Sequence, residues 1–272
     1  MRIDRRLLLG AGLGAGLATA AEAESRPSPA ARAALNSGGL DPHASSDQTE
    51  RLQQAIDAAS SRGVPLALPP GRYVTRALQL RPGTQLIGVA GSTMLHYAGG
   101  GGGLLRAAGA GGLRLTGLVL DGDLKPIAEP RADGLVTLTD CAGLVARDLE
   151  VRNSLGSGIV LRGASGKVAD CRIERVAQAA IFSTDAQGLE IAGNRIAGCG
   201  NNGILVWRSQ KGEDGTIVAG NRIEKISAHA GGSGQNGNGI NVFRAGGVLV
   251  TGNRIADCAF TAIRANAASN AQ

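Results

Sequence analysis

The stretch Ile191-Ala-Gly-Asn-Arg-Ile196 decides the fold, because it returns with small changes along the second half of the chain. Close copies are Val218-Ala-Gly-Asn-Arg-Ile223 and Val250-Thr-Gly-Asn-Arg-Ile255. Counted from the glycines that open them, successive units run 22 to 32 residues, a period typical of solenoid coils. A unit of this length cannot bury a face alone, so each must stack on its neighbours.

The repeated phrases have the chemistry of strands, since they are short, rich in Val and Ile, and bounded by Gly, Asn and Asp. Repetition in one register predicts that each strand lies parallel to its copy in the next coil. Three inward rows are expected: Leu115, Val168, Ile191, Val218 and Val250; Leu120, Val151, Ile173, Ile196, Ile223 and Ile255; and Leu135, Ile159, Ile181, Ile204, Ile240 and Ile263. Asn194, Asn221 and Asn253 recur where the chain turns within a coil, and stacked Asn side chains can hydrogen-bond along such a ladder.

One helix is predicted ahead of the repeats. Asp47 and Glu50 form a capping box, and Gly63 ends the helix. Residues 47–63 would then cap the open end of the solenoid, where unpaired strand edges promote aggregation. The predicted apolar stripe is Leu52, Ala55, Ile56 and Ala59.

These features resemble the pectate-lyase-like right-handed parallel β-helix superfamily, which has three strands per coil and an Asn ladder between the second and third. The resemblance implies an all-β fold, a right-handed parallel β-helix with an N-terminal capping helix, over residues 47–272. The chain is also similar to twin-arginine-translocated repeat proteins of unknown function, a family proposed to bind a cofactor. Because the sequence stops at Gln272 without a covering segment, we expect the β-helix domain to be incomplete at its C-terminus.

The N-terminus has the pattern of an export signal. Arg5 and Arg6 precede a weakly apolar run of Gly, Ala and Leu, and small residues near position 23 offer a cleavage site. Residues 1–23 therefore predict a twin-arginine signal peptide, the twin-arginine translocase as a partner and a periplasmic or secreted protein. The run is shorter than the ~20 residues of a spanning helix, so no stable membrane anchor is expected after cleavage. Residues 24–46 are predicted to be a flexible linker.

The net charge and the spacing of histidines and cysteines limit which nucleic-acid or metal partners are expected. The net charge of +6 is mild, and no basic cluster interleaved with aromatics is present, so no nucleic-acid partner is expected. The three histidines are scattered and no CxxC occurs, which argues against a zinc or haem site. Calcium stays open as a cofactor, because Asp121, Asp123 and Asp133 crowd one loop; a solvated acidic loop is the alternative.

Two long loops mark where a ligand would lie. Residues 121–133 and 224–238 replace a corner that elsewhere takes about six residues. Both precede the strand of the Gly-Ile type, four coils apart, or roughly 19 Å at the usual strand spacing. Side chains alternate between the two faces of a strand, so the residues between the inward ones should form an outward surface. Its aromatic and cationic side chains suit sugar rings that carry carboxylates. The predicted surface residues are Phe182, Trp207, Asn241, Phe243, Arg162 and Arg264. Alternatively, these aromatics pack under the loops or at a protein interface.

Candidate catalytic residues are Asp133, Asp185, His229 and Arg264. In a polysaccharide lyase, Arg264 would be the base and the loop aspartates would hold calcium; in a glycoside hydrolase, Asp133 and Asp185 would be the acid and base. Motifs of the polygalacturonases and pectate lyases are missing from the chain, so catalysis stays open. The alternatives are a non-catalytic solenoid that binds acidic polysaccharide or the cell envelope, and a carrier of a cofactor inserted before export.

A second outward row carries one arginine per coil. Like charges at roughly 5 Å repel, so neighbouring acids are expected to neutralise this row. The arginines are Arg172, Arg195, Arg222 and Arg254, and the expected partners are Glu150, Glu174, Glu224 and Asp257.

Overall fold

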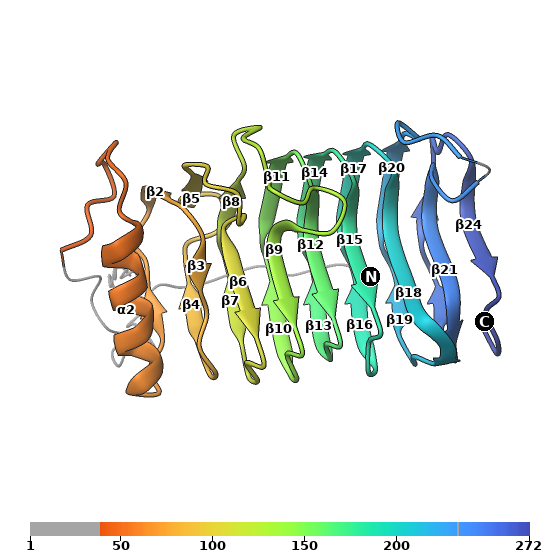
Figure 1. The fold of residues 1–272 in the computed structure, drawn as a ribbon, viewed down its shortest axis with the longest axis horizontal. Helices are drawn as coiled ribbons and strands as arrows, with labels where there is room; N and C mark the ends of the chain where they lie inside the picture. The colour runs from red at the N-terminus through yellow and green to blue at the C-terminus, as the bar shows by residue number, and fades with distance from the viewer. Residues whose placement is uncertain (1–38, 233) are drawn as a thin grey trace, which may run out of the picture.

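The computed structural model describes residues 39–232 and 234–272 and shows a right-handed parallel β-helix (Figure 1), which confirms the predicted fold class. Each coil contributes one strand to each of three parallel sheets of eight strands, here called A, B and C. In Figure 1 the coils follow one another from helix α2 (Thr49–Ser61) at one end to β24 at the other. The expected signal peptide and residues 24–38 of the expected linker lie outside the described residues.

The strands follow the same cycle of sheets from coil to coil. Sheet A contains β1 (Leu66–Ala67), β4 (Gln85–Ile87), β7 (Arg114–Thr116), β10 (Leu144–Arg147), β13 (Gly166–Ala169), β16 (Leu189–Ala192), β19 (Ile217–Ala219) and β22 (Leu249–Thr251). Sheet B contains β2 (Gly71–Thr75), β5 (Thr93–Tyr97), β8 (Val119–Asp121), β11 (Glu150–Ser154), β14 (Arg172–Val176), β17 (Arg195–Cys199), β20 (Arg222–Ile226) and β23 (Arg254–Ile255). Sheet C contains β3 (Leu78–Gln79), β6 (Leu105–Ala108), β9 (Gly134–Thr139), β12 (Ser157–Arg162), β15 (Ala179–Thr184), β18 (Asn202–Glu213), β21 (Asn238–Gly246) and β24 (Thr261–Asn266).

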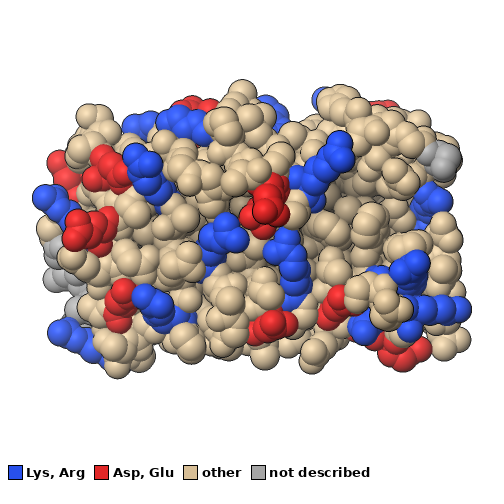
Figure 2. All heavy atoms as spheres, viewed as in Figure 1, with Lys and Arg blue, Asp and Glu red and all other residues tan. Residues whose placement is uncertain are grey.

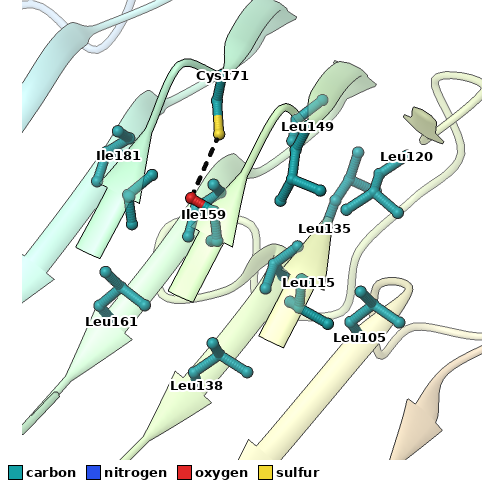
Figure 3. Close-up of a cluster of buried hydrophobic side chains, with 14 of the residues drawn as sticks. Leu105, Leu115, Leu120, Leu135, Leu138, Leu149, Ile159, Leu161, Cys171 and Ile181 are labelled. Atoms are coloured by element: carbon teal, nitrogen blue, oxygen red, sulfur yellow. Dashed lines mark hydrogen bonds between the residues drawn. The ribbon is translucent and has the colours of Figure 1, made fainter. Parts of the chain in front are cut away.

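The core is built from inward rows of aliphatic side chains, as predicted, although Ile263 of the last described coil, expected in such a row, is 50% exposed. Ile173, Ile196 and Ile223 stand opposite one another in sheet B and are almost fully buried. Figure 3 shows leucine and isoleucine side chains of successive coils pointing into the same interior. Burying one such side chain contributes roughly 1.5–3 kcal/mol, so stacking many short coils stabilises a chain whose single coils would not fold.

The predicted row in sheet C is wrong by one residue in β9. Val136, and not Leu135, lies opposite Ile159. Leu135 instead occupies the position of Gly158 in the next coil, where an added Cβ would lie 2.6 Å from the Ala180 carbonyl oxygen. Later coils therefore need a small residue at this position, whereas β9, entered from a long loop, accommodates a buried leucine.

The asparagine ladder is present between sheets A and B. Asn194 Nδ2 donates to Asn221 Oδ1 at 2.9 Å, and Asn221 Nδ2 donates to Asn253 Oδ1 at 2.9 Å. Each Asn oxygen also accepts a backbone N–H of the preceding coil, including that of Cys171. The Asn side chains thus provide hydrogen-bond partners for buried backbone N–H groups at the sharp turn, where the hydrogen bonding between strands is interrupted.

Helix α2 covers the first coil with the buried side chains Leu52, Ile56 and Ala59, and Gly63 follows its end at a φ of 65°. The predicted capping box does not form. Gln48 is the N-cap residue, while the Asp47 carboxylate accepts the Thr49 N–H and pairs with Arg76 at 2.8 Å. Asp47, the residue expected to cap the helix, therefore forms an ion pair with Arg76 of the first coil instead. Within the described residues, no helix has both the length and the apolarity to span a membrane.

Candidate functional site

Two long loops enclose a hollow on sheet C. They comprise residues 122–133, between β8 and β9, and residues 227–237, between β20 and β21, and lie along the same upper part of the solenoid in Figure 1. The strands that lead into them are separated by four coil steps in sheet B, as predicted. Arg131 from the first loop and Gln235 from the second line one hollow of about 260 Å³ over β12, β15 and β18.

Three aromatic rings form the floor of this surface. Phe182 and Trp207 meet edge to face with ring centroids 5.2 Å apart, and Trp207 meets Phe243 at 5.6 Å. All three side chains are half-buried, so part of each ring faces outward. The Arg244 guanidinium lies 4.8 Å from the Phe243 centroid, a cation–π contact.

A second hollow of about 150 Å³ adjoins the first. Trp207 and Gln235 line both hollows, so the two lie side by side on sheet C and are together called the groove here. Arg264 of β24 lines the second hollow beside Asn241 and Phe243. The structure thus brings together Phe182, Trp207, Asn241, Phe243 and Arg264, all of which the sequence predicted for this surface.

Amide side chains tie the second loop to the solenoid. Asn201 Oδ1 accepts the Ala230 N–H at 2.8 Å, and Asn241 Nδ2 donates to the Gln235 carbonyl oxygen at 3.1 Å. Asn238 adds a further bond, from its Nδ2 to the Gly234 carbonyl oxygen at 3.0 Å. The amide of Asn241 therefore holds the wall of the groove. It positions this site rather than pointing freely into it.

Asp133 and Arg162 form a pair at the base of the first loop. The buried Asp133 carboxylate lies 3.4 Å from both Arg106 and Arg162, and Arg162 also donates to the Ala132 carbonyl oxygen. One arginine comes from β6 and the other from β12, so the carboxylate joins coils on either side of β9. These contacts anchor the loop, and neither Asp133 nor Arg162 lines the groove.

The other two aspartates of the predicted calcium site are also occupied by basic groups. Asp121 accepts from Arg152 at 2.8 Å and from Asn153 at 2.9 Å; burial opposes its ionisation, yet these hydrogen bonds hold the pKa of the carboxyl below its ordinary value. Asp123 lies 3.4 Å from Lys125 Nζ and 3.2 Å from His96 Nε2. Burial, together with nearby Arg72, lowers the pKa of His96. In residues 39–232 and 234–272 no three His, Cys, Asp or Glu side chains are grouped as metal ligands would be.

The remaining predicted catalytic residues are not brought together. Asp133 precedes β9 and is held by Arg106 and Arg162, whereas Asp185 follows β15, so two coil steps, roughly 10 Å at the usual strand spacing, separate their strands. An acid–base pair in glycoside cleavage needs roughly 5–10 Å. Asp185 accepts the N–H and hydroxyl of Ser209 and so holds a turn. His229 is exposed on the second loop and does not line the groove.

Several polar lining residues escaped prediction. Arg131, Gln178 and Gln235 face the first hollow. In the described part of the chain, no acidic group lies within salt-bridge distance of Arg131 or Arg264. The amide-rich runs that precede the glycines at 203 and 237 were the available signal, since they stand directly before the strands of sheet C.

Charge is sparse on this side of the molecule. Figure 2 shows basic and acidic side chains scattered over one face with mostly uncharged surface between them, and acidic groups near the middle next to basic ones. Among the described residues that line the groove, Arg131 and Arg264 are the ionisable ones, and no carboxylate is included. The groove is therefore apolar in its floor, polar in its walls and positive at its two ends.

Comparison with solved structures finds the same fold in phage and bacterial proteins. The pre-mature bacteriophage phi29 gene product 12 is 15% identical with a TM-score of 0.64, over 80% of this chain and 32% of that protein. Geobacillus virus E2 ORF18 is 12% identical with a TM-score of 0.60, over 80% and 51%. The A-module of the Azotobacter vinelandii mannuronan C-5 epimerase AlgE4 is 14% identical with a TM-score of 0.51, over 86% and 94%. At these identities the likeness shows the fold alone, and this chain spans about a third of the phi29 protein.

No curated protein matches the chain in sequence. A family model described as the right handed beta helix region matches residues 132–223 and 157–272. The two matches overlap and together extend over about half of the chain, including the strands that carry the aromatic floor. With the three parallel sheets and the Asn ladder, this match establishes that the chain belongs to the right-handed β-helix family.

Proposed function

We propose that the protein binds an extended acidic saccharide along the groove of sheet C. The observation that carries this proposal is the row of three half-exposed aromatic rings between two loops, with an arginine near each end. Sugar rings stack on aromatic faces, and guanidinium groups bind carboxylates in a two-pronged geometry. Gln178 and Gln235 supply amide groups for the sugar hydroxyls. The A-module described above, which has the same fold, is by its name part of a mannuronan C-5 epimerase. The fold is therefore compatible with a polysaccharide ligand.

Binding without cleavage is the activity that we propose. Hydrolysis by an acid–base pair requires two carboxylates beside the bound sugar, and the described lining residues include none. The predicted acids instead hold loops and turns through Arg106, Arg162 and Ser209. Arg264 alone keeps a position beside the rings, where it suits recognition of a substrate carboxylate.

Trp207, the single tryptophan of the chain, makes this proposal directly testable. Its fluorescence should change on titration with oligouronides and should saturate, whereas neutral oligosaccharides of equal length should bind more weakly. Replacing Arg264 and Arg131 by Gln should remove most of that preference, because both charged ends of the groove would be lost. If acidic and neutral oligomers both leave the fluorescence of the folded protein unchanged, the aromatic row serves another purpose, such as a protein interface.

We further propose that the protein acts outside the cytoplasm after export by the twin-arginine translocase. The support is the sequence around Arg5 and Arg6, which lies outside the described residues. Changing both arginines to Lys should leave uncleaved precursor in the cytoplasm, as seen by fractionation and immunoblotting. Continued export of the double variant at the level of the unmodified chain would contradict this route.

A further inference from the structure

A stack of arginines lies on sheet B, away from the groove. Arg172 of β14, Arg195 of β17 and Arg222 of β20 are directly opposite one another in the parallel register, and all three are exposed. Neighbouring strands are about 4.8 Å apart. Two unit charges at that distance repel by roughly 1 kcal/mol even in bulk water, so the stack needs counter-charges.

Arg172 and Arg222, on either side of Arg195, have counter-charges within their own strands. Arg172 pairs with Glu174 at 2.7 Å, and Arg222 lies 3.7 Å from Glu224. Each glutamate stands two positions after its arginine, so both point outward from the same face of the strand. These pairs confirm the predicted neutralisation for two of the four arginines. Glu150 instead pairs with Arg152, and within the described residues no ion pair joins Arg254 to Asp257.

The coil between those of Arg172 and Arg222 breaks this pattern, as does the coil of Arg254, where Ala256 stands two residues after the arginine. Ala197 occupies the position two residues after Arg195, and it lies directly opposite both Glu174 and Glu224. Throughout residues 39–232 and 234–272, no acidic group lies within 4.0 Å of the Arg195 guanidinium. A methyl group thus stands where the adjacent coils place a carboxylate.

Because the Ala197 side chain is shorter than that of glutamate, it leaves an open space beside the unpaired charge of Arg195. A hollow of about 340 Å³ opens at this place. Its lining comes from three successive coils: Arg172, Ile173, Glu174, Arg195, Ile196, Ala197, Arg222 and Glu224. The hollow therefore combines a guanidinium without an acidic partner, a floor formed by the Ala197 methyl group and the strand backbone, and two further arginines on its sides.

We propose that the hollow over Ala197 binds one oxyanion, the carboxylate, phosphate or sulfate group of a ligand. The oxyanion takes beside Arg195 the place that a glutamate carboxylate holds in the coils on either side. The planar guanidinium of Arg195 matches two oxygens of such a group, whereas the charges of Arg172 and Arg222 are offset by Glu174 and Glu224. Glu174 and Glu224 limit the site to a single compact anion, because a longer run of negative charge would meet them. The site is independent of the saccharide groove, which lies on sheet C.

Thermal unfolding in phosphate or sulfate, with chloride at matched ionic strength as reference, tests this site. Both anions also stabilise proteins by exclusion from the surface, so the informative quantity is the difference between variants. The unmodified protein should show a saturable rise in Tm that Ala197→Glu lacks, because the new carboxylate fills the site. Ala197→Glu should also melt higher than the unmodified protein in chloride alone.

Two more variants complete the test. Arg195→Gln should raise the half-saturating phosphate concentration about tenfold or more, because the guanidinium that binds the anion is lost. Ala192→Glu places the same charge on sheet A of the same coil and should keep the full phosphate response. An oligouronide added to Trp207→Ala protein, whose groove is impaired, tells a carboxylate carried by a saccharide from a free inorganic anion. Equal responses of the unmodified, Ala197→Glu and Arg195→Gln proteins to every anion would overturn the proposal.

Discussion

Replacing Asn221 by Ala should lower the free energy of unfolding by roughly 3 kcal/mol or more. Asn221 lies in the middle of the ladder and is 1% exposed. Its Oδ1 accepts from both the backbone N–H and the side-chain amide of Asn194, while its Nδ2 donates to Ile191 O and to Asn253 Oδ1. Alanine would leave these buried groups without partners, at about 1–3 kcal/mol for each group that water cannot reach.

Equilibrium unfolding in urea measures this loss. Asn253→Ala is the matched control, because Asn253 ends the ladder, is partly exposed and lets water replace its bonds. It should destabilise the protein by clearly less than Asn221→Ala does. Equal and small losses for both variants would mean that the ladder contributes little and that core packing alone holds the coils together.

Replacing Trp207 by Ala should weaken binding of an acidic oligosaccharide by about 5- to 150-fold, equivalent to roughly 1–3 kcal/mol. The indole stands between Phe182 and Phe243 and borders both hollows, so its removal interrupts the floor at the centre. Its Nε1 is buried and meets no acceptor in the described part of the chain. A ligand oxygen that reaches this N–H after a small rotation of the ring would add a hydrogen bond in the complex.

Calorimetric titration serves for this variant, since the fluorophore is removed. Ile217→Ala provides the control, because it shortens a 40%-exposed apolar side chain on sheet A, away from the groove. This control should bind as the unmodified protein does, and circular dichroism should show both variants folded. An unchanged affinity of Trp207→Ala would remove the aromatic row from the binding account.

The repeating part of the fold could be predicted because each coil copies its neighbour. One phrase in one register predicts the parallel strands, the rows through Ile196 and Ile191, and the ladder through Asn221. The error in β9 arose where the repeat is interrupted: after the loop 122–133, Gly134 aligns with Ser157 rather than with Gly158. The other strand entered from a long loop, β21, keeps the predicted register, with Ile240 opposite Ile204.

The outward aromatic surface was predictable for the same reason, since period two fixes which side chains of β15, β18 and β21 face out. The roles of the aspartates could not be predicted in this way, because they depend on ion-pair partners in the neighbouring coils. Asp133 is taken up by Arg106 and Arg162, and Asp121 by Arg152. Lining residues such as Gln235 come from loops whose path the repeat does not encode. Reading each outward residue against those one coil before and after it would have found the ion pairs.

A crystal structure of the protein with a bound oligouronide tests the central claim most directly. We expect sugar rings stacked along Phe182, Trp207 and Phe243, between the loops 122–133 and 227–237. At least one uronate carboxylate should contact Arg264 or Arg131, and the oligomer should remain uncleaved. An empty groove at saturating ligand, or an oligomer bound elsewhere on the solenoid, would contradict the account.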